Sequence, residues 1–292
     1  MLDSKTLQEA AALSGTMFDD VLKLSVPRKD LRVTVDGFEI VPFMGLTSWV
    51  ACRKGPQRTT LMGDIVLLED EIGGAVSAAV ESGLYVTSLH NHFIREQPSV
   101  LFMHLEATSD EATLGLSVRK VFDAINAVRQ AHPVAPAVKE VQSDFDTGSL
   151  EGIVGAKGES KNGVLKFTLG RPDVPVKCTR CGDLEINATM GYNTWAAFQG
   201  TKERTAVCGD FAMLELEVAP VIRELRAGGI EVVAVHNHMF FEDPRLIFLH
   251  YWGIGPASDL AVVFRRALDT QKQAPASETC CSGGNNGSMK ED

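Results

Sequence analysis

The chain has 292 residues, 45% of them hydrophobic, and a formal net charge of −10 at pH 7. This length suffices for two domains with a core each, and the acidic balance offers no basic face to a phosphate backbone, so no nucleic-acid partner is expected. No apolar run reaches the roughly 18 residues of a membrane span, and the start lacks a secretion signal. The chain as written is therefore expected in the cytoplasm. If a leader was trimmed, the expected location is the cell envelope or the outside of the cell.

Strands are predicted first along the chain. Two runs with strand-like residues cover 21–28 and 31–40, and the second contains the turn signal Asp36-Gly37. Further strands are predicted around Trp49 and over residues 60–68. The first repeat described below therefore begins as a sheet.

A helix is predicted over residues 71–82, where Gly83 ends the pattern, and a second helix follows Ser109 as its cap. Both helices have an apolar face of the kind that packs on a sheet. The residues of these faces are Ile72, Val76, Ala79 and Val80 in the first helix, and Leu114, Val118, Val121, Phe122 and Ile125 in the second.

Between these helices, residues 88–104 read SLHNHFIREQPSVLFMH and predict a hairpin rich in histidine. Side chains alternate along a strand, so His90 and His92 should share one face. The turn FIREQPS brings the chain back, and His104 on the return strand could join them. Three imidazoles, with Glu96 or a water as the fourth ligand, suit a divalent ion with an open position: zinc first, with copper or iron as alternatives.

The whole pattern occurs twice. Landmarks from Gly45 onward recur at an offset of 146 residues, and the second hairpin reads AVHNHMFFEDPRLIFLH. Six of the seven histidines of the chain lie at matching positions, which favours metal binding over the alternative of a hydrogen-bonded polar core. The corresponding second set is His236, His238, His250 and Glu242.

The order strand, strand, helix, hairpin, helix predicts an α+β fold of two tandem repeats, each an antiparallel sheet covered by two helices. Proline and polar residues mark a linker, and the last stretch is rich in glycine, serine and asparagine. The predicted division is a first repeat at 1–130, a linker at 131–144, a second repeat at 145–270 and a flexible, cysteine-containing tail at 271–292.

The carboxylates near the histidines allow several interpretations. Glu96 and Glu242 lie close to the hairpin turns and could bind the metal, move a proton in catalysis, or simply be solvated. Asp64 and Asp210 each follow a glycine in matching strands, where they could orient an imidazole or form a turn.

The tryptophans Trp49 and Trp195 occupy matching positions and are predicted in the core, with a pocket wall as the alternative.

The cysteines do not share the repeat, because none of them has a cysteine partner in the other copy. The six are Cys52, Cys178, Cys181, Cys208, Cys280 and Cys281, and reduced thiols are expected. Cys178 and Cys181 have the spacing of a redox pair or of half a zinc site, and Cys280 with Cys281 could supply the other half. The alternative is surface thiols without a role, with Cys52 and Cys208 buried as small apolar residues.

Four pairs of repeated motifs carry a resemblance to a known family: GLTSW and GYNTW, MGDIVLLEDEI and CGDFAMLELEV, LHNHFIREQP and VHNHMFFEDP, and FMHLEA and FLHYWG. Through these motifs the chain resembles the LppY/LpqO family over nearly its whole length except the tail. In that family this domain is typically duplicated and its function is unknown, so the resemblance implies no activity. Members often carry an export signal or a lipid-attachment cysteine, and the start of this sequence shows neither.

The leading hypothesis is a protein that binds a divalent metal ion, with one three-histidine site in each repeat. A second hypothesis is a metal-dependent hydrolase or lyase with a small-molecule substrate, in which the metal activates water and Glu96 or Glu242 moves the proton. A third is a non-enzymatic module whose histidine hairpins bind a small ligand without metal. The sequence names neither the metal nor a substrate.

Overall fold

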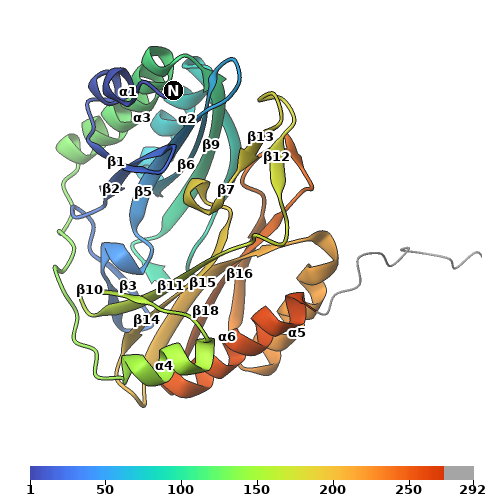
Figure 1. Ribbon diagram of the computed structural model, residues 1–292. Coiled ribbons are helices and arrows are strands. Elements are labelled where there is room, and N and C mark those ends of the chain that lie inside the picture. The colour runs from blue at the N-terminus through green and yellow to red at the C-terminus, as the bar shows by residue number, and fades with distance from the viewer. Residues whose placement is uncertain (273–292) are drawn as a thin grey trace, which may run out of the picture.

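The computed structural model describes residues 1–272 and contains two similar halves, each a six-stranded antiparallel sheet with helices on one face (Figure 1). The strand orders correspond: β1-β2-β5-β6-β9-β7 in the first repeat and β10-β11-β14-β15-β18-β16 in the second. The predicted α+β fold of two repeats with antiparallel sheets is confirmed.

The elements of the first repeat follow the predicted order. Its helices are α1 (Ser4–Ala11), α2 (Glu69–Glu81) and α3 (Glu111–Ala131), with the 3-10 turn η1 (Pro42–Met44). Its strands are β1 (Gly15–Phe18), β2 (Val21–Pro27), β3 (Val33–Val35), β4 (Phe38–Ile40), β5 (Thr47–Lys54), β6 (Thr59–Leu68), β7 (Tyr85–His90), β8 (Glu96–Gln97) and β9 (Val100–Ser109).

The second repeat has the same strands and helices in the same order, with one additional 3-10 turn before its second helix. Its helices are α4 (Thr147–Val154), α5 (Val218–Ala227) and α6 (Ala257–Gln271), with the 3-10 turns η2 (Ala188–Met190) and η3 (Glu215–Glu217). Its strands are β10 (Glu159–Lys161), β11 (Val164–Gly170), β12 (Val176–Cys178), β13 (Leu184–Ile186), β14 (Asn193–Gly200), β15 (Thr205–Met213), β16 (Glu231–His236), β17 (Glu242–Asp243) and β18 (Ile247–Gly255).

The helices differ from the prediction in detail. Each repeat has a third, short helix, α1 or α4, which packs beside the closing helix of its repeat. The cap of α3 is Asp110 rather than Ser109, because the Asp110 carboxylate accepts a hydrogen bond from the Thr113 amide at 2.9 Å. Val80 was assigned to the buried face of α2 but is 60% exposed. None of the helices within residues 1–272 is both long and apolar enough to cross a membrane.

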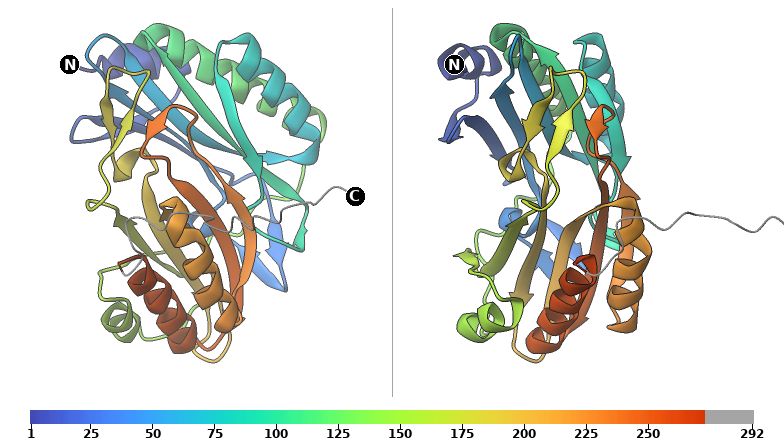
Figure 2. Two further views of the ribbon diagram at one scale, coloured as in Figure 1. Left: turned by 90° about the vertical axis from the view of Figure 1, so that its right-hand side faces the viewer. Right: turned by 45° about the vertical axis from the view of Figure 1, so that its right-hand side comes forward.

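The two faces of each large sheet have different roles. In the first repeat, alternate residues such as Leu22, Leu24 and Val50 pack under the helices. The residues between them, including Lys23 and Trp49, point to the opposite, inner face, which is turned toward the second repeat. Figure 2 shows the resulting arrangement, with the helices outside and the strands of both repeats between them.

A small three-stranded sheet in each repeat extends over the other repeat. The predicted strand at 31–40 is the hairpin β3–β4, which pairs with β8 inside the turn of the histidine hairpin. Its side chains pack in one cluster with Cys208 and Trp252, whereas residues of the equivalent β12–β13 pack with Ala51 and Met62. In Figure 1, β3 accordingly lies beside β14 of the second repeat, and β12 and β13 lie beside the first. The inner faces of the two large sheets are therefore held against each other.

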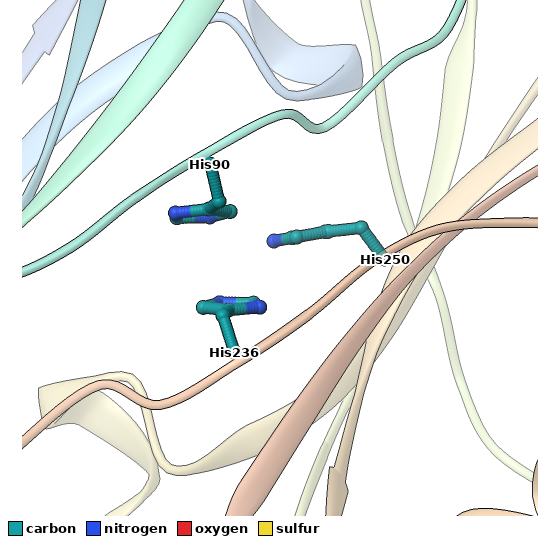
Figure 3. Close-up of side chains that lie close together, drawn as sticks. All are labelled: His90, His236 and His250. Carbon is teal, nitrogen blue, oxygen red and sulfur yellow. The ribbon is translucent and has the colours of Figure 1, made fainter.

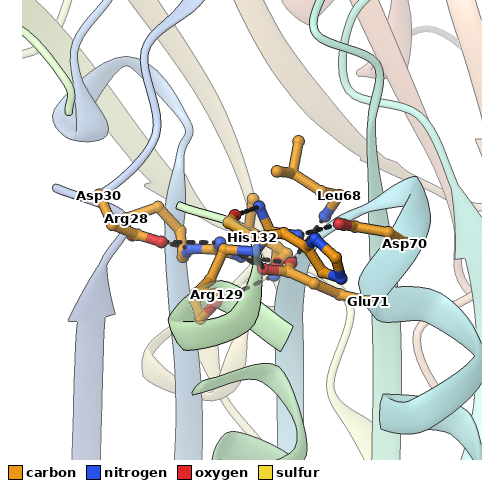
Figure 4. Close-up of polar contacts among 9 residues, drawn as sticks. Arg28, Asp30, Leu68, Asp70, Glu71, Arg129 and His132 are labelled. Carbon is orange, nitrogen blue, oxygen red and sulfur yellow. Dashed lines mark hydrogen bonds and ion pairs between the residues drawn. The ribbon is translucent and has the colours of Figure 1, made fainter. Parts of the chain in front are cut away.

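A buried ion pair fixes the start of α2 to the sheet (Figure 4). The Arg28 guanidinium donates to both carboxylate oxygens of Glu71 at 2.8 Å, and Arg129 of α3 contacts the same carboxylate at 2.7 Å. Glu71 also accepts a hydrogen bond from the Leu68 amide at 2.7 Å. In the second repeat Arg171 pairs with Glu217 in the same way. A charged group this deeply buried is tolerated only when it is paired and hydrogen-bonded.

Residues 132–146 connect α3 to α4 and run along the sheet edge with backbone hydrogen bonds to both repeats. The Arg32 amide donates to the Ala135 carbonyl at 2.7 Å, and the Val141 amide donates to the Asn162 carbonyl at 3.2 Å. The division into two domains, joined by a linker at residues 131–144, stays a prediction. Two hydrophobic clusters contain residues of both repeats, so the repeats share part of their core.

Candidate metal centre

The six repeated histidines lie together in the interior, between the inner faces of the two sheets. His104 sits in the middle of β9 directly opposite Asp64 of β6, and His250 of β18 lies opposite Asp210 of β15. The other four belong to the His-x-His pairs, whose first member ends β7 or β16 and whose second follows the strand. We call His90, His92, His104, His236, His238 and His250 the histidine cluster; each is at most 9% exposed.

The rings of the two repeats meet across the molecule. His90 stacks on His236 with ring centroids 3.8 Å apart, and Figure 3 shows both rings converging with that of His250. The centroids of His92 and His250 are 3.7 Å apart, and those of His104 and His238 are 4.0 Å apart. Each distal histidine therefore lies against the second histidine of the other repeat's pair.

Three groups of side chains could hold a metal ion, because in each group one ligand atom per residue lies within 4.8 Å of the others. Among residues 1–272 these groups are His90 with His236 and His250, His104 with His236 and His238, and Asp64 with His90 and His104.

None of the groups is a triad predicted from a single hairpin, and two of them combine residues of both repeats. The prediction of one triad within each repeat is corrected to groups that combine both repeats, because the two sheets face each other. The distal histidine of one repeat is thereby placed beside the His-x-His pair of the other.

Backbone carbonyls orient the two distal histidines. The Nδ1 atom of His104 lies 3.1 Å from the Gly63 carbonyl oxygen, and that of His250 lies 2.9 Å from the Gly209 carbonyl oxygen. Because a carbonyl can only accept, Nδ1 carries the proton in each ring and Nε2 keeps its lone pair. This is the arrangement by which proteins prepare a histidine to bind a metal ion.

Most nitrogen atoms of the histidine cluster have no hydrogen-bond partner. Within residues 1–272, nine buried ring nitrogens of these six residues lack one, including both nitrogens of His92, His236 and His238. Leaving a buried polar atom unpaired costs about 1–3 kcal/mol, so a cluster of nine needs an explanation. A bound cation that accepts the lone pairs would supply one.

The two aspartates belong to the centre rather than to turns. Asp64 Oδ2 lies 3.5 Å from His92 Nε2, and Asp210 Oδ2 lies 3.4 Å from His238 Nε2. Both are buried in the middle of long strands, so the turn interpretation is wrong. Burial raises the pKa of the Asp64 carboxyl to about 8 and raises that of Asp210 well above its usual range.

Burial also keeps the imidazoles neutral. It lowers the pKa of His104 to about 4 and that of His250 to about 3, although the carbonyl contacts act in the opposite direction. Burial, followed by repulsion from neighbouring histidines, lowers the pKa of the other four well below the usual value. Neutral imidazole is the form that binds metal, so no proton has to be displaced from these rings at neutral pH.

A cavity of about 1090 Å³ leads to the histidine cluster. Its floor includes four of the histidines and both aspartates. Trp49 and Trp195 line it, each only partly buried, so they form pocket walls rather than the predicted core. Lys23 and Lys166 also line the cavity at matching positions of the two repeats, and neither is among the site residues predicted from the sequence. The signal was present: each is a lysine inside a short apolar strand, on the same sheet face as Asp64 or Asp210.

The two glutamates proposed as catalytic groups lie outside the groups of candidate ligands among residues 1–272. Glu96 is partly exposed and lies 3.4 Å from the Asn91 side-chain amide. Glu242 is buried and accepts a hydrogen bond from the Leu246 amide at 3.1 Å. Burial raises the pKa of Glu242 to about 8. A direct role of either at the metal stays a prediction without support from this geometry.

The prediction of reduced thiols is wrong for one pair of cysteines and correct for two others. Cys178 and Cys181 form a disulfide, so the expectation of reduced thiols is wrong for this pair, and in this state neither sulfur is a thiolate that could bind a metal. Cys52 and Cys208 are buried free thiols, as predicted. Cys280 and Cys281 lie outside the described residues.

Comparison with known proteins identifies a family but no activity. The model of a family described as "Domain of Unknown Function (DUF1259)" matches residues 5–124 and 148–270, one segment per repeat. No curated protein sequence matches the chain.

Solved structures that match include a trimeric bacterial microcompartment shell protein, PduB, at 12% identity over 89% of this chain and 91% of that chain, with a TM-score of 0.22. EtuB from Clostridium kluyveri matches at 9% identity over 89% and 92%, with a TM-score of 0.20. These scores are too low to carry an argument about fold or function.

Proposed function

We propose that this chain, which belongs to the DUF1259 family of domains of unknown function, binds divalent metal ions at the histidine cluster between its two repeats. The observation that carries the proposal is the set of nine buried ring nitrogens without hydrogen-bond partners among residues 1–272. A polar core built for stability alone would pair these atoms, since each unpaired one is costly.

Two equivalent ligand sets follow from the repeat. One is His104 with the pair His236 and His238, whose ligand atoms lie close together. The other is its counterpart, His250 with the pair His90 and His92. Asp210 lies beside the first set and Asp64 beside the second. Three imidazoles and one carboxylate form a donor set that suits zinc, and copper or iron(II) would also accept it.

Metal-dependent catalysis is a second candidate, and the cavity above the histidine cluster favours it. A metal ion held there would supply a Lewis acid and lower the pKa of a bound water. The chain itself contributes the buried ligands, neutral imidazoles and a cavity wide enough for a small organic molecule. A hydrolase or lyase would use these features, whereas a metal-free binding module would leave the buried nitrogens unpaired.

Two further assignments belong to this proposal. The likeness of the repeated motifs supports the LppY/LpqO proteins as relatives within the family. A cytoplasmic location stays a prediction, and the disulfide between Cys178 and Cys181 argues against it, since disulfides persist mainly in oxidising compartments.

Cobalt(II) titration tests the metal site directly. We expect visible absorption bands that saturate at about two equivalents per chain, because cobalt replaces zinc in sites with nitrogen and oxygen donors. His238→Ala should reduce the saturating amount, whereas His132→Ala, which changes the exposed seventh histidine, should leave it unchanged. Absence of bands in the wild-type protein, or equal loss in both variants, would refute the proposal.

A further inference from the structure

The cavity that leads to the histidine cluster is lined by lysines, although the protein as a whole is acidic. Among the described residues, five lysines line it, whereas the one lining carboxylate besides the floor aspartates is Glu159. The lysines are Lys23, Lys29, Lys139, Lys161 and Lys166. Within residues 1–272 none of these five forms an ion pair with a carboxylate; the lysine ion pairs there involve other positions. A formal net charge of −10 makes this local excess of positive charge more notable.

Two of these lysines are built into the walls in matching ways. The Lys23 ammonium lies 4.6 Å from the centre of the Trp49 ring, and the Lys166 ammonium lies 3.9 Å from that of Trp195. Each is a cation–π contact, which holds the ammonium group in place. The same pair therefore occurs once in each repeat, and all four residues line the cavity.

The positions of these pairs relative to the metal-binding residues follow from the strand register. Trp49 lies opposite Asp64 on the neighbouring strand, and Lys23 is on the same face one strand further out. Trp195 lies opposite Asp210 in the same way, and Lys166 pairs with Ala197 on the adjacent strand. A ligand in the cavity could thus contact indole and ammonium groups from both repeats.

We propose that this cavity binds an organic anion, a carboxylate or phosphate ester with a flat apolar body, between the two lysine–tryptophan pairs. This inference deepens the proposed function and rests on it for the metal ion at the cavity floor. The ammonium groups recognise the anionic group, and the indole rings, together with Phe18 and Phe43 of the lining, accept the apolar body. The cavity of about 1090 Å³ is slightly larger than the roughly 300–1,000 Å³ usual for small-molecule sites.

The test is calorimetric titration of the full chain with benzoate and with phenyl phosphate, using benzyl alcohol as the neutral analogue. We expect both anions to bind and benzyl alcohol to bind much more weakly. The two anions distinguish a carboxylate site from a phosphate site. Lys23→Met and Lys166→Met each remove one ammonium but keep an apolar side chain, and each should raise the Kd of the anion by roughly tenfold or more, as expected for a hydrogen bond to a charged group. Lys120→Met, at an exposed position of α3 away from the cavity, is the matched control.

The metal content of every sample is measured in parallel. Metal retained in Lys23→Met and Lys166→Met together with weakened anion binding supports the inference. Metal present in the wild type with no binding of either anion, or with binding unaffected by both lysine substitutions, overturns the inference and leaves the metal site standing. The wild type could instead bind the anions in a lysine-dependent way and take up no metal. That result overturns the proposed function and leaves the anion site standing.

Discussion

The imidazole rings of His90 and His236 stack with their centroids 3.8 Å apart and their planes 16° apart, although the two residues occupy the same position in different repeats. This contact lies where the two inner sheet faces meet. The histidine cluster is therefore built from both repeats, and the two proposed sites lie next to each other.

Because the proposed ligand sets cross the repeats, combined substitutions should distinguish a crossed from an uncrossed arrangement. His236→Ala with His238→Ala should leave about one metal equivalent per chain, as expected if one of two three-histidine sites is lost. Adding His104→Ala should cost no further metal, since the crossed arrangement proposed above assigns His104 to the set already removed. Adding His250→Ala instead should remove most of the remainder. The opposite result, in which His104→Ala removes the second equivalent, would show that each site is confined to one repeat.

The buried pair of Arg28 and Glu71 should be important for stability. Glu71→Ala leaves the Arg28 guanidinium buried without its main partner, and we expect it to lower the free energy of unfolding by about 3–5 kcal/mol. Urea denaturation measures this change. Glu39→Ala, which breaks the exposed pair with Arg32, is the control and should cost less than about 1 kcal/mol. Similar effects of the two substitutions would contradict the role assigned to the buried pair.

Glu242 should make the wild-type protein less stable as the pH rises. Its pKa is about 8 in the folded protein and near 4.5 when exposed, so the folded state holds a proton that the unfolded state has lost between these values. The free energy of unfolding therefore falls as the pH rises from about 4.5 to about 8. Glu242→Gln removes this titration and should be more stable than the wild type at pH 8.5 by about 1–3 kcal/mol, with little difference at pH 5. Denaturation of both proteins across this pH range checks the sign; a wild type that gains stability relative to the variant toward pH 8.5 would contradict it.

The disulfide should be separable from the metal centre. Replacing both Cys178 and Cys181 by serine opens a bond between residues only three apart in the chain, so the expected loss is about 2 kcal/mol of unfolding free energy. Metal content should stay at the wild-type level, because neither sulfur belongs to the candidate groups of residues 1–272. Loss of metal in this double variant, with the histidine variants unaffected, would move the site to the cysteines.

The sequence allowed the repeat, the α+β class and the identity of the buried histidines to be predicted, since each depends on local alternation or on the match between copies. It did not show which histidine lies beside which. Alternation along a strand assigns His104 to a face but does not say what packs against that face. Asp64 was open to a turn interpretation because glycine before aspartate is common in turns, and only the position of Asp64 inside the ten-residue strand β6 removes that alternative.

The lysines of the cavity were missed for a related reason. Net charge describes the whole surface, and the acidic total of −10 does not reveal a local group of lysines. Lys23 and Lys166 occupy the same strand position in the two repeats, and both line one shared cavity. That convergence is a property of the assembled fold and not of either repeat alone.

Elemental analysis of the full chain, purified without a polyhistidine tag and dialysed against metal-free buffer, tests the central claim most directly. We expect about two equivalents of a divalent metal per chain, zinc first among them, and almost none in a variant with all six residues of the histidine cluster replaced by glutamine. A folded wild-type protein that contains no metal and takes up none when zinc, copper or iron(II) is supplied would contradict the account.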